Sequence, residues 1–135
     1  MKLYYEIWVD CITRMRSVES NKSNWKVKGI IFMSLAMTLN FVLIMVVLQR
    51  EVLGFNFYEI NLPSLTGFVN FVFTILLLYI FPCVFINYLL IFRNNKYEKL
   101  LIMYKYHNGK LCLTYYIISY FSPIVLLWIG VLWLG

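Results

Sequence analysis

Three long, uninterrupted runs of apolar residues dominate the pattern of the chain. They cover residues 29–48, 68–92 and 111–134, and none of them contains Asp, Glu, Lys, Arg or His. A helix needs about 20 apolar residues to cross the roughly 30 Å hydrocarbon core of a bilayer. Strands of a membrane barrel would instead alternate over about 10 residues. The pattern predicts an all-α integral membrane protein with three transmembrane helices, in a single membrane domain over residues 1–135.

Residues 1–16 show the pattern of an amphipathic helix. Its apolar positions recur at steps of three and four, at Leu3, Ile7, Trp8, Cys11, Ile12 and Met15. Its other side carries Lys2, Glu6, Asp10, Thr13, Arg14 and Arg16. Asp10 and Arg14 are four apart, in the order that favours an ion pair on a helix surface. We expect an amphipathic interfacial helix on the inner membrane surface; docking to a partner protein is the alternative role for the same face.

The two connections between the runs differ in character. In residues 49–67, glycine and proline interrupt any continuous helix, and Asn61-Leu62-Pro63 predicts the start of the second helix. The aromatic and apolar residues of this connection are expected to lie back on the outer interface: Phe55, Phe57, Tyr58 and Ile60. Residues 93–110 predict a short cytoplasmic helical loop between a bend at Asn94-Asn95 and a turn at Asn108-Gly109.

Composition and charge then predict an orientation. The 135 residues are 62% hydrophobic and only 13% charged, whereas a soluble domain has about 25% charged residues. This excludes a soluble enzyme, a secreted disulfide scaffold and a disordered tail. Of the twelve cations, six lie in residues 1–28, five in residues 93–110 and one in residues 49–67. Because Lys and Arg concentrate in cytoplasmic loops, we expect a cytoplasmic N-terminus and an extracytoplasmic C-terminus. We expect the membrane to be a plasma (inner) membrane, and the residue usage suggests a bacterial one.

The cations also predict what the cytoplasmic side contacts. Basic residues next to membrane helices attract anionic lipid headgroups. The residues expected to make this contact are Arg14, Arg16, Lys26, Lys28, Arg93, Lys96, Lys99 and Lys105. The net charge of +6 is then explained by topology, and no nucleic acid is expected as a partner.

Weakly polar residues and prolines interrupt the apolar runs. The polar residues are Asn40, Asn70, Thr74, Asn87, Ser119 and Ser122. They are candidates for polar helix–helix contacts or, alternatively, for lining a pore. Pro82 and Pro123 predict helix kinks that free the carbonyls of Leu78 and Ser119. Paired interruptions are typical of transporter sites, although proline in membrane helices usually tunes packing.

The residue types needed for chemistry are sparse. His107 is the only histidine, so a metal site built from several histidines is excluded. Cys11, Cys83 and Cys112 form no CxxC and no ligand spacing, and we interpret them as ordinary small apolar residues. We expect no catalytic residue, no metal, no cofactor and no enzymatic activity.

These features favour a non-enzymatic accessory or assembly subunit of a larger membrane complex. Two alternatives stay open on the sequence. One is a small channel or transporter formed by self-association, and the other is a holin-like membrane-permeabilising protein. The expected partners are the bilayer with its anionic headgroups and either another membrane protein or a second copy of the chain.

Overall fold

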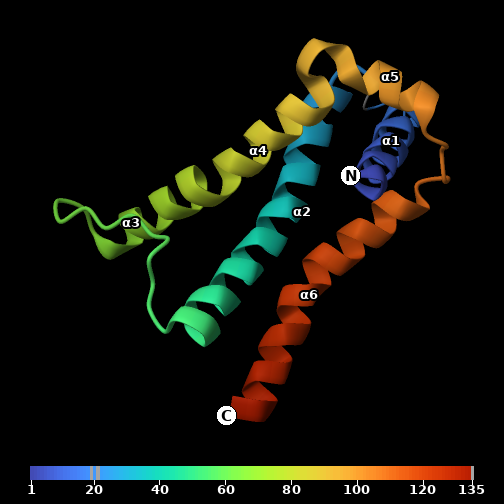
Figure 1. Ribbon diagram of the computed structural model, residues 1–135. Helices are drawn as coiled ribbons and strands as arrows, with labels where there is room; N and C mark the ends of the chain where they lie inside the picture. The colour runs from blue at the N-terminus through green and yellow to red at the C-terminus, as the bar shows by residue number, and fades with distance from the viewer. Residues whose placement is uncertain (19, 21, 135) are drawn as a thin grey trace.

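All the regular secondary structure in the part of the chain that the structure describes is helical (Figure 1). The structure is a computed structural model that describes residues 1–18, 20 and 22–134; positions 19, 21 and 135 of the predicted domain lie outside the described residues. The α-helices are α1 (Lys2–Ser17), α2 (Trp25–Val47), α3 (Gly67–Phe73), α4 (Phe81–Asn87), α5 (Lys96–Met103) and α6 (Lys110–Leu134). The short segments between them are η2 (Leu48–Leu53), η3 (Thr74–Ile80), η4 (Tyr88–Phe92) and η5 (Arg93–Asn95).

Three helices among the described residues are long and apolar enough to cross a membrane. They are Trp25–Leu53, Gly67–Met103 and Lys110–Trp133. The runs 29–48 and 68–92 fall within the first two, and the third covers the run 111–134 up to residue 133. The first and second helices extend beyond their runs because helical geometry continues through the polar flanks, into η2 at one end and α5 at the other. The all-helical architecture with three such helices is therefore confirmed.

The second long helix bends sharply where the sequence predicts it. Asn94 and Asn95 have φ of 56° and 53°, in the left-handed region that asparagine tolerates better than most residues. The bend turns α5 across the top of α1 (Figure 1). The second turn lies at Asn108 and Gly109, which have φ of 56° and 75°. Two pairs of left-handed residues thus bring α5 and the start of α6 around α1.

The predicted start of the second helix at Asn61-Leu62-Pro63 is wrong. The helix begins at Gly67, where the Thr66 hydroxyl caps it by accepting a hydrogen bond from Val69 N at 3.4 Å. Residues 61–63 stay outside the helix because the Asn70 side chain pairs with the backbone of Leu62. Asn70 Oδ1 accepts from Leu62 N at 3.2 Å, and Asn70 Nδ2 donates to Leu62 O at 3.1 Å.

Tyr58 turns inward rather than lying back on the outer interface. Its ring packs edge-on against Phe41 and Tyr79, with centroids 5.9 and 5.3 Å apart. Its hydroxyl donates to the Leu78 carbonyl at 2.8 Å. This is the carbonyl that Pro82 leaves without an intrahelical partner, and the wide π-turn η3 precedes the proline. The loop therefore satisfies the backbone group that the proline frees.

The N-terminal helix is present, and part of its apolar face packs within the protein. Trp8, Cys11 and Ile12 are 0–1% exposed and belong to the main hydrophobic core. That core gathers residues of α1, α2, η4, α5 and α6: Trp8, Cys11, Ile12, Met33, Ile91, Phe92, Tyr97 and Cys112. The middle of the apolar face of α1 is therefore covered by the protein itself, whereas Leu3 at its start is 61% exposed.

Candidate functional site

Asp10 forms the most connected polar site among the described residues. Its side chain is fully buried on α1 and accepts four backbone N–H groups just before and within the first turn of α6. Oδ1 accepts from His107 N and Gly109 N at 2.9 and 3.0 Å. Oδ2 accepts from Leu111 N and Cys112 N at 2.9 and 3.2 Å. The carboxylate caps a helix N-terminus, where orphan N–H groups and the helix dipole favour negative charge.

The predicted Asp10–Arg14 ion pair on the helix surface is wrong. Both carboxylate oxygens of Asp10 are occupied by the backbone of the α6 start. The stem of Arg14 instead lies over Gly109, where an added Cβ would be 3.3 Å from Arg14 Cγ. Position 109 thus needs glycine twice, for its left-handed φ and for this close approach.

A disulfide between Cys11 and Cys112 joins the same two helices. The expectation that these cysteines are ordinary small apolar residues is therefore wrong, whereas Cys83 is free and buried. The bond closes a loop over a sequence separation of 101 residues. Cross-linking a loop of about 100 residues restricts the unfolded chain by roughly 4–5 kcal/mol in the chain-entropy model. The sequence feature that could have indicated this pairing is that Cys11 and Cys112 both belong to the end of the molecule that is rich in cations.

Asn87 holds α1 against the middle helices. Its Oδ1 accepts hydrogen bonds from the Tyr4 hydroxyl and from Trp8 Nε1, the latter at 3.3 Å. Its Nδ2 donates to Ser34 Oγ on α2 at 3.0 Å. Burial raises the pKa of Tyr4 to about 12, so its hydroxyl stays a neutral donor at physiological pH. Sequence reasoning singled out Asn87 but missed both of its donors on α1.

Asn40 and Ser119 join α2 to α6. Asn40 Nδ2 donates to Ser119 Oγ at 2.8 Å, and Ser119 is fully buried. Ser122 lies one turn further along α6, just before Pro123. Its Oγ is buried and has no hydrogen-bond partner among the described residues, like Thr38 Oγ1 and the Tyr116 hydroxyl.

Asn70 and Thr74 are committed to the loop that precedes them. Thr74 Oγ1 accepts from Ile60 N at 2.9 Å and donates to Asn70 O at 2.8 Å. Gln49, which the sequence analysis missed, supports the same loop from η2. Its Oε1 accepts from the backbone N–H groups of Phe57 and Tyr58 at 3.0 and 3.2 Å. The buried polar side chains at this end therefore form hydrogen bonds with the backbone of the loop.

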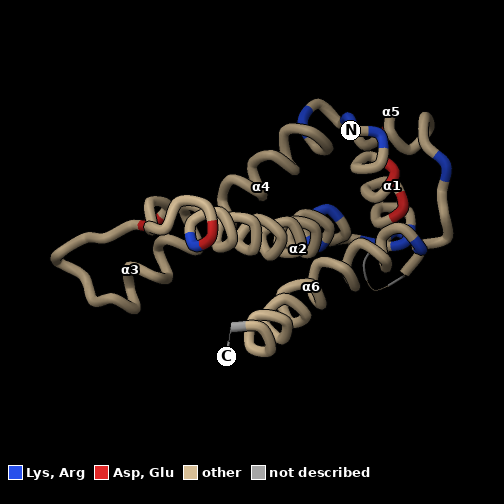
Figure 2. Tube along the Cα trace, turned by 60° about the horizontal axis from the view of Figure 1, so that its bottom comes forward, with Lys and Arg blue, Asp and Glu red and all other residues tan. Residues whose placement is uncertain are grey.

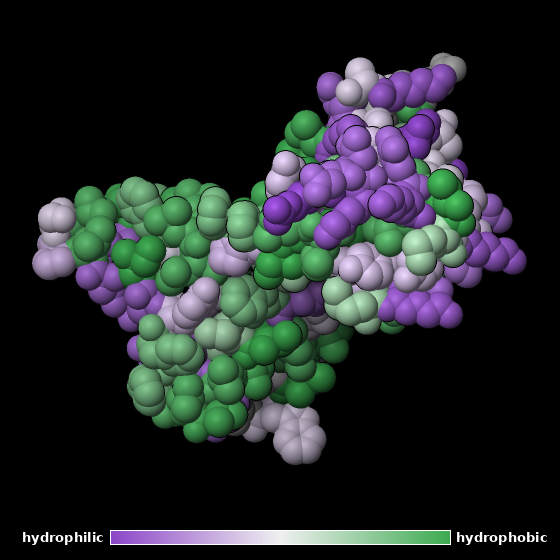
Figure 3. Space-filling view, turned by 45° about the horizontal axis from the view of Figure 1, so that its top comes forward, coloured by the Kyte–Doolittle hydropathy of each residue, from purple (hydrophilic) through white to green (hydrophobic). Residues whose placement is uncertain are grey.

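The cations gather at the end formed by α1, α5 and the starts of α2 and α6, with Arg50 at the opposite end (Figure 2). Hydrophilic side chains concentrate over this end, whereas apolar side chains cover most of the rest of the face in view (Figure 3). Arg16 and Lys26 lie over the Trp25 ring at 5.4 and 5.7 Å, and Lys26 also lies 4.9 Å from the Tyr97 ring centre. Of the eight basic residues expected to contact lipid headgroups, seven have exposed side chains and Lys28 is half-buried; the seven are Arg14, Arg16, Lys26, Arg93, Lys96, Lys99 and Lys105.

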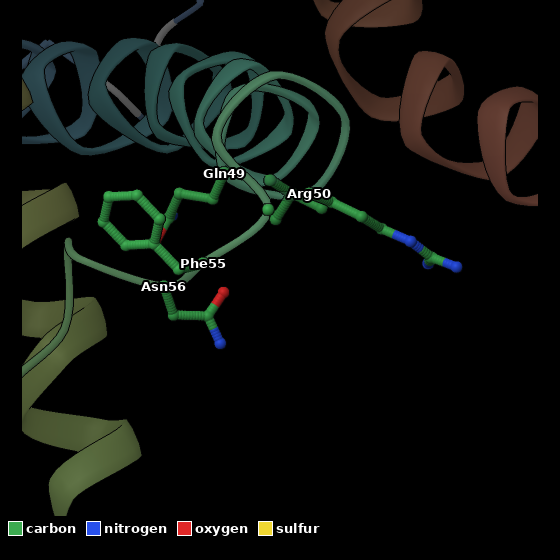
Figure 4. A pocket seen from close by; sticks show the side chains of 6 residues that line it. Gln49, Arg50, Phe55 and Asn56 are labelled. Carbon is green, nitrogen blue, oxygen red and sulfur yellow. The ribbon is translucent and has the colours of Figure 1, made fainter.

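The opposite end carries two adjoining hollows. A pocket of about 320 Å³ is lined by Val46, Gln49, Arg50, Gly54, Phe55 and Asn56 (Figure 4). A groove of about 590 Å³ lies between α2–η2 and the half of α6 that begins at Pro123. Val46 and Arg50 line both.

The described residues do not gather metal-ligating side chains at one point. No group of three or more His, Cys, Asp or Glu there could hold a metal ion. His107 takes part in the Asp10 site through its backbone N–H. Comparison of the chain with protein-family models, curated proteins and solved structures gives no match.

Replacing Asp10 by Asn tests the cap. The amide keeps one acceptor oxygen but turns an NH₂ group toward two backbone N–H donors, and the charge is lost. We expect the free energy of unfolding to fall by about 3 kcal/mol or more, measured by reversible unfolding in SDS with the disulfide reduced. The matched variant Glu98→Gln changes an exposed carboxylate and should stay within about 0.5 kcal/mol of the parent. Equal stability of the two variants would contradict the assignment.

Proposed function

We propose that the chain is an integral membrane protein of a plasma or inner membrane, with the basic end in the cytoplasm. The three long apolar helices support insertion. The cation bias supports the orientation, since the connection that contains Arg50 carries the single cation assigned to the other side.

The disulfide is an argument against this orientation. It lies at the basic end, which the orientation places in the cytoplasm, whereas disulfides persist mainly in oxidising compartments. The orientation nevertheless follows the cations, since the bias is summed over twelve residues. Burial then protects the bond on a reducing side. Cys11 is 0% exposed and Cys112 is 7% exposed, and thiol–disulfide exchange needs access to a sulfur.

Two single cysteine variants test the orientation. Lys105→Cys places a thiol on the exposed loop at the basic end, and Asn56→Cys places one on the exposed loop at the other end. A membrane-impermeant maleimide added to intact cells should label Asn56→Cys and leave Lys105→Cys unlabelled until the cells are lysed. Labelling of Lys105→Cys alone in intact cells would reverse the orientation.

Within this membrane, the function supported best is that of a non-enzymatic accessory subunit of a larger complex. The observation that carries it is Trp128 on α6, whose side chain is 71% exposed. It lies five residues before Trp133, roughly 7.5 Å deeper along the helix. The indole N–H of a tryptophan normally finds an acceptor when it leaves water, and no acceptor contacts Trp128 within the described part of the chain. A partner helix with an acceptor would satisfy it.

The internal polar contacts favour this role over a pore. Asn40 bonds Ser119, Asn87 bonds Ser34, and Asn70 and Thr74 bond the preceding loop. A pore would need these groups to face water or solute. The remaining outward face of α6 is apolar, with a hollow of about 320 Å³ lined by Ile124, Val125, Trp128, Ile129 and Leu132.

A photo-crosslinking residue at position 124, beside Trp128, tests the subunit role. In intact membranes it should give one discrete adduct with a larger membrane protein. Trp128→Phe keeps the ring but loses the N–H donor, and should reduce adduct yield several-fold. Trp133→Phe is the control, since headgroup-level water can accept that indole, and should leave the yield unchanged. Adducts with lipid alone, or with a second copy of this chain, would contradict the proposal.

A further inference from the structure

The groove between α2–η2 and α6 is open and apolar. In a bilayer, another molecule would have to fill it. Its walls are formed by Leu43, Val46 and Val47 on one side and by Leu126, Leu127 and Val131 on the other. Because no water enters the hydrocarbon core, an apolar groove there must be filled by another apolar group. Along α6 the groove extends from Pro123 to Val131.

The depth of the groove matches one leaflet of a bilayer. Toward the middle of the molecule its lining stops at Leu43 and Pro123, and about one helical turn beyond them the hydrogen bond from Asn40 Nδ2 to Ser119 Oγ at 2.8 Å joins α2 to α6. The groove reaches Arg50 and Glu51 at its other end. Ten residues of helix separate Asn40 from Arg50, which is roughly 15 Å and half of a hydrocarbon core of about 30 Å. A spanning helix, about 10–12 Å wide, would have to continue past this hydrogen bond, whereas an acyl chain of one leaflet ends there.

The open end of the groove is polar and charged. Arg50 reaches from η2 toward the side where α6 lies (Figure 4) and also lines the polar pocket beside Asn56. Arg50 Nε and Glu51 Oε1 are 3.7 Å apart, and both side chains are largely exposed. An exposed pair of this kind contributes little to stability, so both charges are available to a ligand.

We propose that this composite site binds one zwitterionic phospholipid. An acyl chain lies in the groove, the phosphate accepts hydrogen bonds from the Arg50 guanidinium, and the headgroup ammonium lies beside the Glu51 carboxylate. Guanidinium matches phosphate geometry with two parallel N–H donors. The adjacent opposite charges on the protein complement the adjacent opposite charges of the headgroup. The site lies on the side of α6 away from the hollow beside Trp128, so it is independent of the proposed subunit contact.

Lipid retention by the purified protein tests the site. The protein is equilibrated with vesicles of mixed phosphatidylethanolamine and phosphatidylglycerol, transferred to mild detergent and weighed by native mass spectrometry. We expect one retained phosphatidylethanolamine per chain. Arg50→Gln should lower the retained fraction about tenfold. Gly130→Leu should lower it equally by filling the groove, since a Cβ at Gly130 meets nothing within 4 Å and the backbone is undisturbed.

Two matched variants control for loss of charge and added bulk elsewhere. Arg93→Gln removes an exposed cation at the opposite end, and Val125→Phe adds bulk on the other side of α6. Both should retain phosphatidylethanolamine as the parent does, because the contact expected of Arg93 is with anionic headgroups such as phosphatidylglycerol. The proposal is overturned if all four variants retain it equally, if phosphatidylglycerol is retained in preference, or if a protein occupies the groove in place of lipid. Unchanged cross-linking from position 124 in Gly130→Leu would show that the two surfaces are separate.

Discussion

The carboxylate of Asp10 determines how the two ends of the chain meet. A buried charge is costly unless every lone pair is matched, and here four backbone N–H groups surround it within 3.2 Å. Those N–H groups belong to a helix start that would otherwise be unsatisfied. The carboxylate and the N–H groups therefore satisfy each other's hydrogen bonds away from water, and α1 packs against the rest of the protein. This docking also brings Cys11 beside Cys112 and places Trp8 within reach of Asn87.

At the other end, too, side chains form hydrogen bonds with backbone groups that have no partner within a helix. Gln49, Asn70 and Thr74 take up the N–H groups of the loop, and Tyr58 returns a donor to the Leu78 carbonyl. At both ends of the molecule, the polar residues of the apolar helices thus form hydrogen bonds with other segments of the same chain. Between them, α6 contacts α2 through Asn40 and Ser119 and then diverges. What α6 presents beyond Pro123 is an apolar surface, and it is the surface to which we assign the proposed lipid and partner contacts.

The sequence contains enough information for the helices but not for their polar contacts. Uncharged runs of about 20 residues identify the three long helices, and paired asparagines identify the bend, because both are local signals. Asp10 could not be found this way, since its position on the polar side of an amphipathic pattern is also that of a surface residue, and its partners are about 100 residues away. The Cys11–Cys112 pairing likewise depends on the folded chain. The helix start predicted at Asn61-Leu62-Pro63 was wrong because the Asn70 side chain bonds the backbone N–H and carbonyl of Leu62.

Amide hydrogen exchange at residues 107, 109, 111 and 112 tests most directly whether Asp10 holds α1 to α6. None of these four N–H groups bonds a carbonyl of α6, because they precede the helix or lie in its first turn, and such amides normally exchange freely. With the disulfide reduced, they should exchange far more slowly than unprotected amides. Protection should be lost together at all four in Asp10→Ala. Fast exchange in the parent protein, as for an α1 lying free on the membrane surface, would contradict the central claim.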